Sequence, residues 1–163
     1  MHYLIDGNNL IGHHRDLSLA DGDCRGQAIS LVAGFCRGTG GRATIFFDGG
    51  PDTNVGEGGV SLGAVRALLA GKGVEADTRI LQLMDRAPGE DAYVVVSSDR
   101  KIYGRARSQG FRALRIHEFC AEMETAGRRS VAGDERRAEL QEKSRHLPPE
   151  EVEEWLDIFG DDS

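Results

Sequence analysis

Short apolar runs alternate with segments of helical periodicity along the first 125 residues. Continuous apolar runs at 3–5, 43–47 and 92–96 are typical of strands that are buried on both faces. Between the first two runs, apolar residues of the segment 29–36 recur every three or four positions, which indicates a helix. This alternation predicts an α/β fold in which helices cover both faces of a parallel sheet.

Two further strands and three further helices follow from weaker signals. Residues 65–69 are interpreted as a strand, although their pattern also fits a helix, and residues 111–116 as a fifth strand. Apolar positions in 80–84, the basic segment after Asp99 and residues 117–124 predict helices. The glycine-rich stretch that follows residue 48 contains no Gly-Lys-Ser/Thr sequence, so it is not interpreted as a P-loop.

The last part of the chain differs in character. We expect residues 1–125 to form the domain and residues 126–163 to form an acidic tail. After two prolines, Val152, Trp155, Leu156 and Phe159 have helical spacing and predict an amphipathic helix near 149–159. This helix either packs on its own domain or docks on a partner, which is another protein or a second copy of the chain in a homodimer.

Composition excludes several classes of protein. The chain has 163 residues, of which 39% are apolar, and no apolar stretch approaches the roughly 20 residues of a membrane span. The start of the chain lacks the pattern of a signal peptide. Three cysteines without a Cys-x-x-Cys pair argue against a disulfide framework or a structural zinc site. We therefore expect a cytoplasmic protein that does not bind a membrane.

The net charge of −7 is confined to the tail. Residues 1–130 carry 16 basic and 16 acidic residues, whereas residues 131–163 carry 4 and 11. The segment 100–115 is rich in arginine and contains no carboxylate, so it forms a local basic patch that would attract phosphates. We predict phosphate contacts from Arg100, Lys101 and Arg105.

Aspartates stand at the ends of the predicted strands. Asp6, Asp48 and Asp99 each follow an apolar run, and Asp77 begins the helix after the third strand. Any one of them alone is more often a turn residue, but parallel strands end at one edge of a sheet, where ligands bind. Carboxylates that share an edge repel one another unless cations are present, and Mg²⁺ or Mn²⁺ are the natural occupants. Such ions promote phosphodiester hydrolysis.

The motifs that contain these residues resemble those of a known family. Asp6-Gly7-Asn8-Asn9-Leu10-Ile11-Gly12, Phe46-Phe47-Asp48-Gly49, Glu75-Ala76-Asp77-Thr78-Arg79-Ile80 and Val96-Ser97-Ser98-Asp99-Arg100 occur in the order of the NYN branch of PIN-like nucleases. The YacP-like ribonuclease group is the nearest match, and the resemblance covers about residues 2–120. It implies a three-layer α/β/α fold with a parallel sheet in the order 3-2-1-4-5, and metal-dependent cleavage of RNA.

The resemblance also assigns roles by position. Asp6, Asp77 and Asp99 would bind the metal, assisted by Asn9, and Asp48 matches a less uniformly catalytic acid. Ser97 or Ser98 matches a hydroxyl that orients the last acid or touches a phosphate. Asn8 departs from the family pattern, since many relatives have an aromatic residue at this position. Glu75 is an additional acid that could bind the metal, but Asp77 is the preferred ligand.

Three functions are consistent with these motifs and charges. The first is a metal-dependent endoribonuclease that acts on RNA, with the ribosome or another ribonucleoprotein as a further candidate partner. The second is a catalytically inactive RNA-binding or adaptor module that acts through the Trp155 helix. The third, a small-molecule phosphatase, lacks an identifiable nucleophile with its own acid or base.

Overall fold

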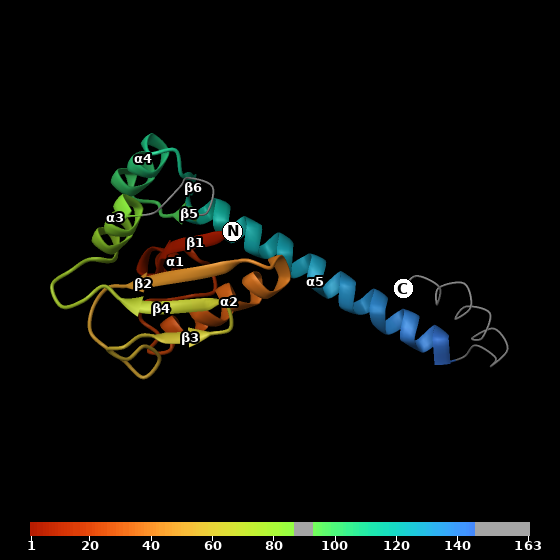
Figure 1. Cartoon of the computed structure of the whole chain (residues 1–163). Helices are drawn as coiled ribbons and strands as arrows, with labels where there is room; N and C mark the ends of the chain where they lie inside the picture. The colour runs from red at the N-terminus through yellow and green to blue at the C-terminus, as the bar shows by residue number, and fades with distance from the viewer. Residues whose placement is uncertain (87–92, 146–163) are drawn as a thin grey trace. The chain divides into compact units, whose positions relative to one another are not determined.

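The computed structural model describes residues 1–86 and 93–145, and in this part six strands form one sheet (Figure 1). The sheet order is β3-β4-β2-β1-β5-β6. Five of the strands are parallel: β1 (His2–Asp6), β2 (Arg42–Phe47), β4 (Val65–Leu69), β5 (Tyr93–Val96) and β6 (Arg112–Leu114). Counted along the chain, these five have the predicted order 3-2-1-4-5, so the predicted fold class is confirmed.

An additional strand extends one edge of the sheet. β3 (Val60–Leu62) pairs antiparallel with β4, with Val60 opposite Ala67. The sequence pattern does not predict this strand, because it has only three residues and lies in a glycine-rich segment. It closes the outer side of β4, which would otherwise expose unpaired backbone groups.

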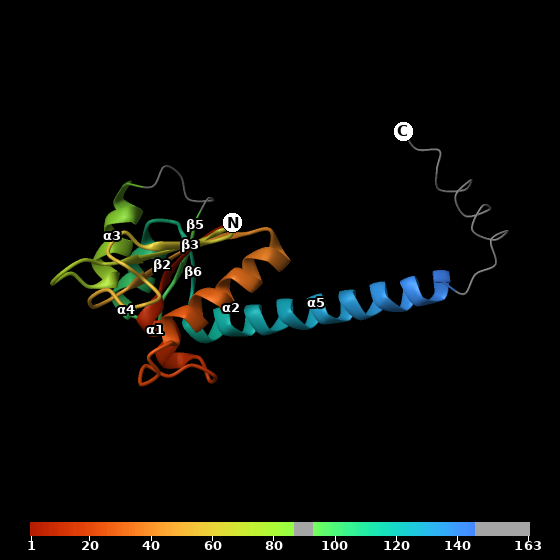
Figure 2. The same ribbon diagram turned by 90° about the horizontal axis from the view of Figure 1, so that it is seen from below.

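Helices cover both faces of the sheet. The first turns of α5 (Ile116–Arg145) share one apolar cluster with α1 (Gly7–His13) and α2 (Cys24–Thr39). The other cluster contains residues of α3 (Ala76–Arg86) and α4 (Arg100–Ser108). Neighbouring strand residues face opposite clusters, since Phe47 belongs to the first and Phe46 to the second. Figure 2 shows α2 and α3 on opposite sides of the sheet, which makes the domain three-layered.

Helix α1 begins directly after β1, where Asp6-Gly7 on its own is typical of a turn at the end of a strand. Asp6 is the N-cap of this helix, and its Oδ1 accepts a hydrogen bond from the Asn9 backbone N at 3.0 Å. Gly7 is required because α1 approaches β2 closely. A Cβ atom at Gly7 would overlap the Phe47 ring and lie 2.8 Å from Ile45 Cγ2.

Helix α5 is longer than the pattern predicts. The apolar spacing indicates a helix over 117–124, and a separate exposed helix is expected near 135–143. In the structure α5 is one helix that continues to Arg145 through exposed side chains such as Val131 and Leu140. Its continuation is rich in Glu, Arg and Ala, which favour a helix without an apolar face.

The chain divides by its contacts into two units, Met1–Gly127 and Arg128–Ser163. The predicted helix near 149–159, with Trp155, lies outside the described residues. Among the helices of residues 1–86 and 93–145, none combines the length and apolar character of a membrane span.

Candidate active site

The four predicted aspartates lie beyond the carboxyl ends of the parallel strands. Asp6 is the last residue of β1, Asp48 directly follows β2, and Asp99 lies three residues after β5. Asp77 is in the first turn of α3, which follows β4. We call this part of the molecule the carboxylate edge.

Asp6 is the most enclosed of the four acids. Its relative exposure is 8%, and burial raises the pKa of its carboxyl group. Hydrogen bonds from Asn9 oppose this shift, whereas the negative charges of Asp48 and Asp77 raise the pKa further. Asp48 and Asp77 are therefore close enough to Asp6 for their charges to act on its carboxylate.

Two asparagines of α1 hold the acids in place. Asn9 donates to Asp6 Oδ1 from its backbone N at 3.0 Å and to Oδ2 from its Nδ2 at 3.4 Å. The Asn8 side-chain Oδ1 accepts a hydrogen bond from the backbone N of Asp48 at 2.9 Å. Asn8, which departs from the aromatic residue expected from the resemblance, thus ties α1 to the loop after β2.

Asp48 connects that loop to the start of α3. Its Oδ1 accepts a hydrogen bond from the Ala76 backbone N at 2.5 Å, which satisfies a free N–H of the first helical turn. Asp77 is the next residue, and it is half-buried, whereas Glu75 is exposed. Asp48 and Glu75 also line a cavity of about 920 Å³ beside the edge.

Asp99 lies at the same edge but is exposed. Its Oδ1 accepts hydrogen bonds from the backbone N atoms of Lys101 at 2.8 Å and Ile102 at 3.2 Å, so it is the N-cap of α4. Ser97 is fully buried, and its Oγ accepts a hydrogen bond from the Asp99 N at 3.1 Å. Ser98 Oγ accepts one from the Ile116 N at 3.3 Å. These bonds fit the orienting role of the Ser97 hydroxyl.

Arg25 is a site residue that the sequence pattern does not predict. From α2 it donates to the carbonyl oxygens of Asp48 at 2.5 Å and Gly50 at 2.8 Å. Its Nη1 lies 3.2 Å from Asp52 Oδ2, and its guanidinium lies over the Phe47 ring at 5.4 Å. These partners are more than 20 residues away, so the sequence near Arg25 holds no signal for the contact. Arg25 fixes the loop that carries Asp48.

The basic patch of residues 100–115 is partly neutralised. Arg105 forms an ion pair with Asp85 at 2.8 Å, and Arg112 forms one with Glu122 at 3.0 Å. Arg115 lies over the Tyr103 ring at 4.3 Å. Arg100 and Lys101 are exposed in the first turn of α4, next to Asp99. Of the predicted phosphate contacts, Arg105 is therefore already engaged.

In the part of the chain that the structure describes, no three His, Cys, Asp or Glu side chains are grouped tightly enough to hold a metal ion by themselves. The charges of Asp48 and Asp77 act on Asp6, whereas Asp99 follows β5, the strand that pairs with β1. The carboxylate edge thus offers carboxylate oxygens as ligands, but among the described residues no three of these side chains enclose a single ion position.

Comparisons with known proteins place the chain in a family. The model of the YacP-like NYN domain matches residues 3–160, so the match includes most of the acidic tail as well as the region of the recognised motifs. No curated protein matches the chain.

Two crystal structures of Rae1 (YacP) from Bacillus subtilis are similar to this chain. The first has 22% sequence identity and a TM-score of 0.72, and the match covers 96% of this chain and 92% of that one. The second, of a mutant of the same protein, has 23% identity and a TM-score of 0.64, with 93% and 88% covered. At this identity the likeness concerns the fold. The fold and the family match together show that the chain belongs to the YacP-like NYN domain family, which has a PIN-like nuclease fold.

Proposed function

We propose that this chain is an endoribonuclease that hydrolyses RNA phosphodiester bonds at the carboxylate edge with the help of Mg²⁺ or Mn²⁺. The observation that carries the proposal is a buried Asp6 at the end of the central strand β1, with Asp48 and Asp77 beside it. An anionic site of this kind in a PIN-like nuclease fold is suited to a cation and, through the cation, to a phosphate.

The donor set fits a hard divalent ion. Mg²⁺ prefers oxygen ligands and is usually held by one or two carboxylates together with water and substrate phosphates. An edge without a closed three-ligand cage among the described residues is compatible with that mode of binding. Asp6 and Asp77 would hold the ion, and Asp99 would reach it through the carboxylate oxygen that does not cap α4.

The remaining residues have supporting roles. The ion would polarise the scissile phosphate and lower the pKa of the attacking water. Asn9 orients the Asp6 carboxylate, and Ser97 orients the backbone of Asp99. Asp48 positions the first turn of α3, and with it Asp77. Arg100 and Lys101 would bind phosphates that flank the scissile bond, because backbone contacts position a nucleic acid.

The partners proposed here are RNA and, through RNA, the ribosome or another ribonucleoprotein. A role of the Trp155 helix in docking on a protein or on a second copy of the chain is a separate proposal, since that helix lies outside the described residues.

The test is cleavage of an end-labelled single-stranded RNA in Mn²⁺ or EDTA. We expect the parent to cut the RNA only with Mn²⁺. Asp77→Asn should reduce the rate by more than about 100-fold, because a metal contributes several kcal/mol to transition-state stabilisation. Asp85→Asn, a control at the other end of α3, should keep cutting. Binding of RNA without Mn²⁺-dependent cleavage would instead favour the inactive RNA-binding module.

A further inference from the structure

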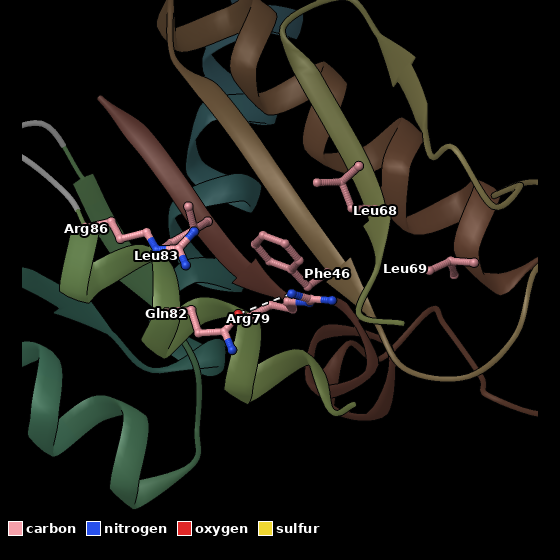
Figure 3. Close-up of a pocket in the computed structure, with 7 residues that line it drawn as sticks. All are labelled: Phe46, Leu68, Leu69, Arg79, Gln82, Leu83 and Arg86. Atoms are coloured by element: carbon pink, nitrogen blue, oxygen red, sulfur yellow. Dashed lines mark hydrogen bonds between the residues drawn. The ribbon is translucent and has the colours of Figure 1, made fainter. Parts of the chain in front are cut away.

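A pocket of about 290 Å³ lies on the sheet face beside α3 (Figure 3). Helix α3 packs on β1 and β2 and leaves the neighbouring face of β4 incompletely covered, so that Leu68 is only partly buried. Side chains from β2, β4 and α3 line the pocket: Phe46, Leu68, Leu69, Arg79, Gln82, Leu83 and Arg86.

The pocket is lined by apolar side chains together with a few polar and positively charged ones. Phe46, Leu68 and Leu83 are apolar, and Figure 3 shows the Phe46 ring between α3 and the Leu68 side chain. The polar lining residues are two arginines and a glutamine, and none of the described residues that line the pocket is acidic. An apolar cavity with a few polar groups is the usual form of a site for a small organic group. The two positive charges favour a ligand that is attached to anions.

The polar side is held in place by hydrogen bonds. Arg79 donates from Nε to the Ala70 carbonyl oxygen at 2.6 Å and from Nη1 to Gln82 Oε1 at 3.2 Å. Its planar guanidinium is therefore fixed before any ligand binds. A fixed guanidinium plane is a stacking surface for an unpaired base, and a Gln side chain can hydrogen-bond a base edge.

The pocket adjoins the carboxylate edge. Phe46 precedes Asp48 by two residues on the chain, and Arg79 belongs, with Asp77, to the first four residues of α3. Leu69 lines both this pocket and the larger cavity that Asp48 and Glu75 line. Two residues of a strand span about 7 Å. A nucleotide next to a phosphate at the carboxylate edge would thus have its base within reach of the pocket.

We propose that this pocket receives one unpaired base of the RNA, next to the bond that is cut. The inference rests on the proposed function and adds a base subsite to it. The base would enter between the apolar side chains of the pocket and the Arg79 guanidinium. Arg86, at the rim, would bind the attached phosphate through charge-assisted hydrogen bonds.

The experiment compares intact and abasic RNA. The full chain carrying Asp99→Asn is titrated with a labelled single-stranded RNA and with a series in which one nucleotide at a time is abasic, and binding is followed by fluorescence anisotropy. Stacking contributes about 1–3 kcal/mol per base, so one abasic position should weaken binding by about 5- to 150-fold. The other positions should have smaller effects.

Variants of the pocket provide the control. Leu83→Trp fills the pocket and should remove the penalty at that position, whereas Leu31→Trp on α2, at a leucine of similar exposure (39% against 38%), should keep it. Gln82→Trp is a second filling variant at an exposed position, for use if Leu83→Trp does not fold, as judged by circular dichroism.

The outcomes separate this inference from the proposed function. If the parent cuts RNA but every abasic position has the same effect, or if both filling variants retain the penalty, the base subsite is wrong and the nuclease stands. If the parent neither binds nor cuts RNA, the proposed function fails, and the base subsite fails with it.

Discussion

Asp48 Oδ1 and the backbone N of Ala76 form a 2.5 Å hydrogen bond between residues that are 28 positions apart. The bond joins the loop after β2 to the first turn of α3, where Asp77 follows Ala76. The side chain of Asp48 is thereby committed to a neighbouring backbone group. In the proposed function, Asp48 therefore has a positioning role, and Asp6, Asp77 and Asp99 would bind the ion.

Two substitutions of Asp48 distinguish positioning from ion binding. Asn retains an oxygen that accepts the bond from Ala76, so Asp48→Asn should keep cleavage within about tenfold of the parent, the factor that corresponds to one weakened hydrogen bond. Asp48→Ala leaves the helix N–H unsatisfied and should lower the stability by about 1–3 kcal/mol and the cleavage rate more strongly. Urea unfolding and initial cleavage rates check this. If Asp48→Asn lost as much cleavage activity as Asp77→Asn, Asp48 would instead be a ligand of the ion.

Asp99 allows its capping and chemical roles to be separated. Asn caps helices as well as Asp does, so Asp99→Asn should lose cleavage and keep the parent's thermal stability. Asp99→Ala should lose cleavage and also about 1 kcal/mol of stability, because the N–H groups of Lys101 and Ile102 lose their acceptor. Paired melting curves and cleavage assays measure both effects. Cleavage at the parent rate by Asp99→Asn would remove Asp99 from the site.

Arg25 should act on the reaction through the Asp48 loop. Arg25→Lys keeps the charge but not the fork that reaches the Asp48 and Gly50 carbonyl oxygens. We expect the variant to be less stable by about 1–3 kcal/mol, from hydrogen bonds of a charged group. The value of kcat should fall while KM for RNA changes little, since Arg25 positions an acid and does not touch the substrate. Arg37→Lys, also on α2, is the control. A rise in KM alone would indicate direct RNA binding by Arg25.

The basic patch should contribute unequally to RNA binding. Lys101 is exposed next to Asp99, whereas the charge of Arg105 is paired with Asp85. Lys101→Gln should weaken binding and reduce the salt slope by about 1, the value for one lost phosphate contact. Arg105→Gln should change the affinity for RNA and the salt slope less than Lys101→Gln does. Equal effects of the two variants in a salt titration would contradict this ranking.

The sequence predicts the parallel strands of the sheet and most of the helices between them, because these elements depend on local apolar patterns. The apolar runs ending at Ile5, Phe47 and Val96 are buried strands, and the acids that follow them lie at the carboxyl ends of these parallel strands. Helix α1 is not predicted, since Asp6-Gly7 on its own is typical of a turn at the end of a strand. The choice between turn and helix depends on how closely α1 packs on Phe47, which no local pattern encodes.

The supporting contacts of the site are beyond local patterns. Arg25, Asn8 and Asp48 contact backbone groups 23 to 40 residues away, and only the folded chain brings them together. The same holds for the ion pair of Arg105 with Asp85. This pair reduces the positive charge of a patch that the sequence alone shows as uniformly basic.

The proposed function depends above all on the binding of a divalent ion by Asp6, which is enclosed beside Asp48 and Asp77. Isothermal titration of the purified chain with Mn²⁺ tests this binding without any RNA. We expect saturable binding by the parent and binding weaker by more than about tenfold in Asp6→Asn, in which the Asn side chain still caps α1. Identical isotherms for the parent and Asp6→Asn, with both proteins folded, would contradict the assignment of Asp6 as a ligand.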